Sequence, residues 1–91
     1  MPKPPRVDLR SRVYDPNDFV TSGKWVRVSS SNVASIRYDN DNHVMWVRFL
    51  NGQIYYYSDV LPSIARRFFM SASKGKFIWA LRRSGYVGVK V

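Results

Sequence analysis

The sequence predicts an α+β fold, in which an antiparallel meander of three to four strands is followed by two C-terminal helices packed on one face of the sheet. Two observations lead to this prediction. Apolar and polar residues alternate from Trp25 to Tyr57, which is the period of half-buried strands, and from Pro62 onward the apolar residues recur at helical spacing. With 91 residues and no cysteine, one small hydrophobic core must stabilise the whole fold.

Residues 1–24 are expected to form a flexible, basic arm that contains prolines. The three prolines of Met1–Arg6 fix φ and remove backbone donors, which favours extended and solvated chain. Asp15-Pro16-Asn17-Asp18 has the composition of a turn. We therefore expect a single domain at residues 25–91, and we expect that deletion of residues 1–22 changes the melting temperature little.

The meander is expected to begin with a short strand at Trp25–Val28 and to continue with strands at residues 33–38, 44–50 and 53–58. Asp39-Asn40-Asp41-Asn42 supplies turn residues between the first two of these longer strands. Alternation places two sets of side chains on the core face of the sheet. They are Ala34, Ile36 and Tyr38 in the first of these strands, and Met45, Val47 and Phe49 in the second.

The Asn51-Gly52 pair is a strong hairpin signal, because both residues accept the positive φ angles of a tight turn. A two-residue loop there places Tyr55 and Tyr57 on the same face as Trp46, whereas a three-residue loop places Tyr56 there instead. Either register leaves at least one tyrosine beside Trp46, and the sequence does not choose between them.

Two helices are expected after the meander, at residues 62–72 and 76–83, with Pro62 in the first turn and Gly85 after the end. Both are expected to cover the core face of the sheet and to leave the other face at least partly exposed. The inward side chains are predicted to be Ile64, Ala65, Phe68, Phe69 and Ala72 in the first helix, and Phe77, Ile78 and Leu81 in the second.

The chain is strongly basic, and its charge is concentrated towards the C-terminus. Fifteen Lys and Arg residues against six Asp, with no Glu, give a formal net charge of +9. Residues 60–91 hold basic side chains and no acidic ones. Such a chain is attracted to polyanions, which include nucleic acid and acidic protein surfaces. No apolar run approaches the roughly 20 residues that span a bilayer, so we expect a soluble protein that is not secreted.

The composition does not favour an enzyme. One His, no Glu and no Cys exclude a zinc site of ordinary composition, paired Glu residues and a Cys/His nucleophile. Asp39-Asn40-Asp41-Asn42 opens like a calcium loop, but Val44 and Leu50 occupy positions that need Gly and Glu. Ser73-Lys74-Gly75 lacks the spacing of a phosphate loop, and Ser73 is expected to be a helix N-cap. We expect no catalytic residue, no metal and no cofactor.

Several short segments, taken in their order and spacing over about residues 28–86, resemble the KTSC domain. The segments are Ser30-Ser31-Asn32-Val33, Phe49-Leu50-Asn51-Gly52, the Tyr-x-Tyr of Tyr55 and Tyr57, Val60 with Pro62, and Ser73-Lys74-Gly75-Lys76-Phe77 leading towards Tyr86. Leu61 is an insertion relative to the family pattern, and Trp79 and Arg82 are unusual for it. The family is named for its occurrence at the C-terminus of some lysyl-tRNA synthetases and also occurs as small bacterial and phage proteins. The resemblance implies an RNA-binding role and a cytoplasmic location in a bacterium or a phage-infected host cell.

Two surfaces combine cations with aromatic rings, which is what the binding of single-stranded nucleic acid requires. The first is the open sheet face with Arg37, Trp46, Arg48 and a contribution from Tyr55 and Tyr57, or from Tyr56 in the other register. The second is one face of the last helix, with Lys76, Trp79 and Arg83, and with Lys74 close to its start. Alternatively, the sheet aromatics are cross-strand packing pairs, Trp79 is a core residue, and the cations only solvate the surface.

The leading hypothesis is a small non-enzymatic module that binds RNA or single-stranded DNA. In this hypothesis Trp46 and a tyrosine stack on bases, and the phosphates are contacted by Arg37, Arg48, Lys74, Lys76 and Arg83. The alternative is a protein-binding module, for example a phage-encoded modulator that docks on an acidic surface of a host machine such as the transcription apparatus. Neither hypothesis involves a membrane or a small-molecule substrate, and both use the same basic surface.

Overall fold

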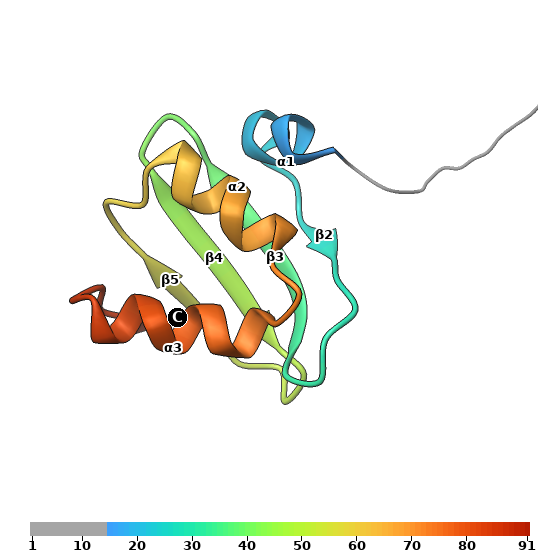
Figure 1. Cartoon of the computed structure of the whole chain (residues 1–91), viewed down its shortest axis with the longest axis vertical. Coiled ribbons are helices and arrows are strands. Elements are labelled where there is room, and N and C mark those ends of the chain that lie inside the picture. The colour runs from blue at the N-terminus through green and yellow to red at the C-terminus, as the bar shows by residue number, and fades with distance from the viewer. Residues whose placement is uncertain (1–14) are drawn as a thin grey trace, which may run out of the picture.

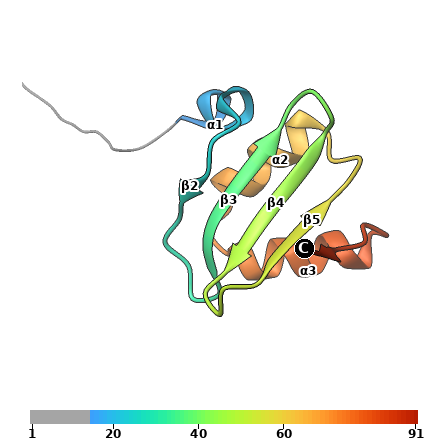
Figure 2. The same cartoon turned by 180° about the vertical axis from the view of Figure 1, so that it is seen from behind.

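A five-stranded antiparallel sheet, covered on one face by helices, makes up the described part of the chain, residues 15–91 of the computed structural model (Figure 1). The strand order is β2-β3-β4-β5-β6, so each strand pairs with its neighbour in sequence. Seen from behind, the other face of the sheet carries none of the helices of residues 15–91 (Figure 2). The elements are α1 (Pro16–Ser22), β2 (Val26–Arg27), β3 (Val33–Asp39), β4 (Val44–Phe49), β5 (Ile54–Tyr57), α2 (Pro62–Met70), α3 (Lys74–Arg83) and β6 (Val89–Lys90).

The α+β architecture and the meander predicted from the sequence are confirmed, and the three longer strands agree with the prediction to within one residue at each end. Two elements among the described residues were not predicted. One is the helix α1, and the other is the short edge strand β6, which pairs with Tyr55 and Tyr56 of β5. A strand of two residues is too short to produce a recognisable alternation, so the sequence pattern does not reveal it.

Helix α1 lies within the segment that the sequence assigned to a flexible arm, and for these residues that expectation is wrong. The carboxylate of Asp15 accepts a hydrogen bond from the backbone N–H of Asp18 at 2.9 Å, and Pro16 occupies the first helical turn. An Asp-Pro pair starts helices as readily as turns, because Asp caps free N–H groups and Pro has no N–H to lose. The rest of the expected arm, residues 1–14, lies outside the described residues.

α1 is anchored to the core by two apolar side chains. Phe19 and Val20 are buried, and the ring of Phe19 stacks on that of Phe69 in α2 with 4.9 Å between centroids. The helix ends at Gly23, whose φ of 68° is a left-handed conformation that favours glycine. Residues 16–22 are therefore part of the folded domain.

The predicted core face of the sheet is confirmed with one change. Met45 and Val47 of β4 are fully buried. In β3 a bulge between Val33 and Ser35 shifts the pleat, so that Val33 is buried with Ile36 and Tyr38, whereas the predicted Ala34 is only half-buried. The prediction from sequence alternation assumed a regular strand without a bulge, so it placed Ala34 instead of Val33 on the core face.

The β4–β5 hairpin closes with three residues, Leu50–Gly52. The backbone N–H of Phe49 donates to the carbonyl of Gln53 at 2.9 Å, and Gly52, at φ 90°, donates to the carbonyl of Phe49. Trp46 consequently pairs with Tyr56 across the two strands.

This register decides the orientation of the tyrosines. Tyr56 lies on the open face beside Trp46, as the three-residue alternative predicted. Tyr55 and Tyr57 face the helices, and Tyr57 is fully buried. The two-residue alternative, which placed Tyr55 and Tyr57 on the open face, is therefore wrong.

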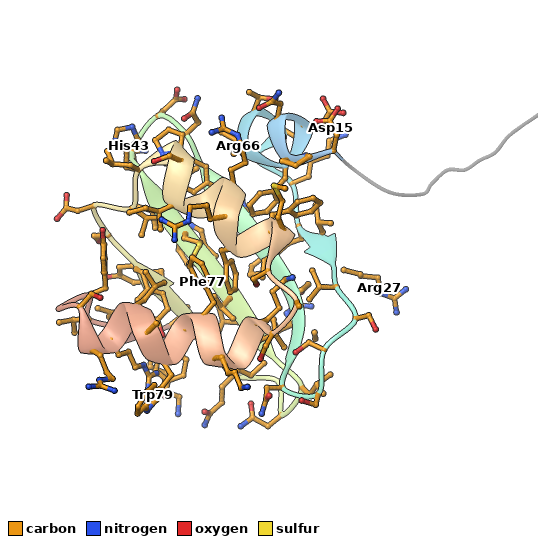
Figure 3. All side chains as sticks on the ribbon, viewed as in Figure 1. Asp15, Arg27, His43, Arg66, Phe77 and Trp79 are labelled. Carbon is orange, nitrogen blue, oxygen red and sulfur yellow. The ribbon has the colours of Figure 1, made fainter. Side chains whose placement is uncertain are left out.

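Both C-terminal helices form, with shifted ends. α2 stops at Met70, so Ala72, predicted to be an inward residue, lies outside the helix and is exposed. α3 starts at Lys74, two residues earlier than predicted, and Ser73 is its N-cap, with a hydroxyl that accepts from the N–H of Lys76 at 3.3 Å. Phe77 lies between α2 and α3, and its ring centroid is 5.3 Å from that of Phe68 (Figure 3).

Within residues 15–91, the helices are too short and too polar to cross a membrane.

Candidate nucleic-acid interface

An open groove of about 800 Å³ lies between α3, the loop that enters β3 and the β4–β5 turn, and we call it the α3 groove. Its lining mixes two side-chain amides, two cations, an indole and apolar side chains. These side chains include Asn32, Phe49, Asn51, Lys76, Trp79 and Arg82. Amides, cations and a flat ring are the groups that read base edges, neutralise phosphates and stack on bases.

Three segments that are distant in sequence, and that carry the family resemblance, meet at this groove. They are residues 30–33, 49–52 and 73–77. The backbone N–H of Leu50 donates to the carbonyl of Asn32 at 2.9 Å, which joins the first two segments. A Cβ atom on Gly75 would lie 2.8 Å from Oδ1 of Asn32, so the third segment approaches the first closely at a glycine.

Trp79 projects from α3 into solvent, on the side of the helix away from Phe77 (Figure 3). Its side chain is 61% exposed, which contradicts the alternative that Trp79 is a core residue. The guanidinium of Arg83, one turn later, lies 4.7 Å from the centroid of its ring. Lys76, one turn earlier, is exposed as well. The predicted face of Lys76, Trp79 and Arg83 is therefore present on α3.

Lys74 does not belong to this face, although the sequence placed it among the phosphate-binding residues. Its side chain is buried, and Nζ donates to the carbonyl of Ser71 at the end of α2, at 2.6 Å. Burial lowers the pKa of the Lys74 amine below its ordinary value. Because α3 starts at Lys74, the side chain turns back onto the C-terminus of α2, where a cation satisfies free carbonyls. Lys74 therefore has a structural role.

Arg82 lines the groove but was not among the site residues predicted from the sequence, and the same holds for Asn32 and Asn51. Nε of Arg82 donates to the hydroxyl of Tyr57 at 3.2 Å, and its guanidinium lies 5.8 Å from the ring centroid of Tyr55. The predicted site residues Tyr55 and Tyr57 thus contact the groove residue Arg82. They are not exposed rings on which a base could stack. The sequence feature that could have identified Arg82 is its helical spacing, since Arg82 follows Trp79 by three residues.

The open sheet face carries the other predicted site residues, and its aromatic rings are already in contact with neighbours. Trp46 is half-buried, with the guanidinium of Arg37 at 5.8 Å and the ring of Tyr56 at 5.2 Å from its ring centroid. Its Nε1 is buried and has no hydrogen-bond partner among residues 15–91. Nε of Arg37 donates to the carbonyl of Gly23 at 2.7 Å. Arg37 and Trp46 are thus largely engaged within the protein.

Arg48, the third predicted residue of this face, is exposed and lies over Trp25, with 5.0 Å between its guanidinium and the ring centroid. Trp25 itself is 36% exposed. Arg48 therefore remains accessible to an anion, whereas the rings beside it are partly covered.

The Asp39–Asn42 segment is a turn, as predicted. The carboxylate of Asp39 accepts from the backbone N–H groups of Asp41 and Asn42 at 3.0 and 3.2 Å, and from the side-chain amide of Asn42 at 2.8 Å. Hydrogen bonds from the Asn42 side chain, and next from its backbone, lower the pKa of Asp39. Across the described part of the chain, His and Asp side chains do not gather in groups of three that could hold a metal ion.

These features define a small α+β domain with a basic groove along its last helix. The model of the KTSC domain family matches residues 29–86, and the chain belongs to this family. A solved structure of a KTSC domain protein from Yersinia pestis shares 30% sequence identity, covering 75% of this chain and 96% of that chain, with a TM-score of 0.66. A comparison with curated proteins gives no match. The family resemblance drawn from the sequence is thereby confirmed.

Proposed function

We propose that the protein is a non-enzymatic module that binds single-stranded RNA or DNA in the α3 groove. The observation that carries this proposal is the exposed indole of Trp79, which stands beside the groove between the cations Lys76 and Arg83. A base stacked on an exposed aromatic ring contributes about 1–3 kcal/mol to binding.

The order of these side chains along α3 suits a strand that follows the helix. Lys76 precedes Trp79 by three residues and Arg83 follows it by four, so one cation lies about one turn to either side of the indole. A strand along α3 would place a base on Trp79 and a phosphate near each cation. The amides of Asn32 and Asn51, across the groove, supply donors and acceptors for base edges.

We assign the stacking role to Trp79 and not to Trp46, which the sequence predicted for this role. Stacking on Trp46 would require displacement of Arg37 or Tyr56 from its ring, and Arg37 is also bonded to the carbonyl of Gly23. The exposed Arg48 keeps a supporting role, because its positive charge attracts polyanions at a distance.

The test is a titration of a fluorescent uridine dodecamer, a thymidine dodecamer and a duplex of equal length at several salt concentrations. Both single strands should bind more tightly than the duplex, with an affinity that falls steeply as salt rises. Trp79→Ala should weaken the binding of single strands by about 1–3 kcal/mol and leave the salt dependence unchanged.

Absence of binding to every oligonucleotide at low salt would contradict the proposal. The alternative of an acidic protein partner on the same basic surface would then take its place, and a screen of acidic peptides against Lys76→Ala and Arg83→Ala variants would examine it.

A further inference from the structure

Arg82 differs from Lys76, the other cation that lines the α3 groove, because its guanidinium is held in place. Nε donates to the hydroxyl of Tyr57 at 3.2 Å, and the group lies 5.8 Å from the ring centroid of Tyr55. Arg82 and Lys76 are both exposed, but of the two only Arg82 has such a side-chain hydrogen bond and ring contact within residues 15–91. An arginine fixed by two partners loses less conformational freedom when it binds a ligand than a mobile one does.

The two tyrosines that hold Arg82 are themselves fixed. Tyr57 is fully buried, and Gly88 packs so closely on its phenol that a Cβ there would lie 2.9 Å from both Cζ and the hydroxyl oxygen. The ring of Tyr55 meets that of Phe49 edge-on, with 5.7 Å between centroids and 86° between planes. Because both partners have little freedom, the direction of the guanidinium is set by the sheet.

The terminal nitrogens of Arg82 are the donors left for a ligand. Of the five N–H groups of a guanidinium, the one on Nε is used by Tyr57, which leaves the two terminal nitrogens. Arg82 is exposed, lines the groove and follows Trp79 by three residues on the same helix. A base stacked on the indole therefore presents its edge close to a guanidinium fork of defined orientation.

We propose that Arg82 is a base-reading residue that selects guanine, and that Tyr57 and Tyr55 are its positioning residues. This role rests on the proposed function. Two terminal nitrogens match the O6 and N7 acceptors of guanine, which is the commonest specific pairing of arginine with a base. Phosphate contacts tolerate mobile side chains, and Lys76 and Arg83 already supply them, whereas the reading of a base edge requires fixed geometry.

The experiment compares uridine octamers that carry one central guanosine, adenosine, inosine or 7-deazaguanosine, titrated against the unchanged protein. All four have the same charge, so phosphate contacts contribute equally. Guanosine should bind roughly five- to one-hundred-fold more tightly than adenosine. Inosine, which keeps O6 and N7, should retain the preference, and 7-deazaguanosine, which lacks N7, should lose most of it.

Variants separate positioning from packing. Arg82→Lys keeps the charge but removes the fork, and it should abolish the guanine preference while the salt dependence persists. Tyr57→Phe should reduce the preference in the native chain and have no further effect on it when combined with Arg82→Lys. Tyr38→Phe is the matched control, because it also removes a buried hydroxyl, one that donates to the carbonyl of Val60, and it should leave the preference unchanged.

Equal affinity for the guanosine and adenosine octamers would overturn the inference, while the proposed function would stand if Trp79→Ala still weakened binding. A failure of all four octamers to bind would overturn both. A preference that survives 7-deaza substitution would also reject the assignment. The analogue series needs no variant, so it decides the point even where Tyr57→Phe does not fold.

Discussion

The α3 groove and the open face of the sheet contain the same kinds of residue and use them differently. Each has a tryptophan with an arginine over its ring: Arg83 lies 4.7 Å from the ring centroid of Trp79, which lines the groove, and Arg37 lies 5.8 Å from that of Trp46 on the sheet. Trp79 is 61% exposed, however, whereas Trp46 is half-buried with a buried ring nitrogen. An arginine–tryptophan pair therefore does not by itself indicate a binding site.

The difference has a geometric cause. On a sheet, a residue has cross-strand neighbours on both sides, so Arg37 of β3 and Tyr56 of β5 both approach Trp46 of β4. On the exposed face of α3, Trp79 has the guanidinium of Arg83 one turn further along the helix, and its ring extends into solvent. The sheet thus covers its aromatic residues with each other, and the helix leaves one of them uncovered.

The largest expected effect concerns α1, which packs on α2 and β3 and contributes no lining to the α3 groove. Phe19→Ala should destabilise the protein by about 3–5 kcal/mol, because it removes a fully buried aromatic ring that stacks on Phe69. Urea unfolding would measure the loss. The same reasoning revises the sequence-based expectation, since deletion of residues 1–22 should now lower the melting temperature substantially.

Oligonucleotide affinity provides the control for this variant. Phe19→Ala should bind single strands with nearly native affinity at a temperature where it is folded, because the groove is built from other elements. A parallel loss of binding in the folded protein would show that α1 and the groove are not independent.

The next effect compares the two tryptophans directly. Trp46→Ala should cost about 2 kcal/mol of stability, below the 3–5 kcal/mol of a fully buried aromatic residue, and should change affinity little. Trp79→Ala should change stability by less than about 0.5 kcal/mol, because the ring is exposed, and its effect should appear in binding. The reverse pattern, with a binding defect specific to Trp46→Ala, would move the interface to the sheet face.

The fold was predictable from the sequence to the extent that hydrophobic periodicity encodes it. The alternation correctly predicted the burial of Met45 and Val47. The helical spacing correctly predicted that of Ala65 and Phe68, although the predicted inward residue Ala72 is exposed. The Asp-Pro start of α1 was predicted to be a turn, because the same residues favour a turn and a helix N-terminus. Only the burial of Phe19 distinguishes the two.

The candidate site was predictable only in part. Spacing along one helix placed Lys76, Trp79 and Arg83 on a common face, but whether that face is covered depends on tertiary packing. The contact of Arg82 with Tyr57 joins two elements that are 25 residues apart, and local periodicity contains no information about such a contact. The burial of the Lys74 side chain was likewise not predictable from local spacing, because it depends on where α2 ends.

A smaller effect is expected at Gly75, where the groove wall and α3 approach most closely. A helical Gly→Ala change normally stabilises by up to about 1 kcal/mol. Here the added Cβ would lie 2.8 Å from Oδ1 of Asn32, so the Asn32 amide must move from its place in the groove. Gly75→Ala should therefore leave stability about unchanged or slightly increased while weakening single-strand binding a few-fold, as parallel unfolding and titration would measure. Unchanged affinity would remove Asn32 from the interface.

The smallest expected effect compares two lysines that are two residues apart on α3. Lys76 is exposed, so Lys76→Ala should remove one phosphate contact and flatten the dependence of log affinity on log salt by about 0.7 for a single strand. Lys74 is buried against the carbonyl of Ser71, so Lys74→Ala should lose about 1 kcal/mol of stability. It should leave the salt slope unchanged. Titrations of both variants with the same uridine dodecamer at four salt concentrations provide the measurement, and equal slopes for the two variants would show that Lys76 contacts no phosphate.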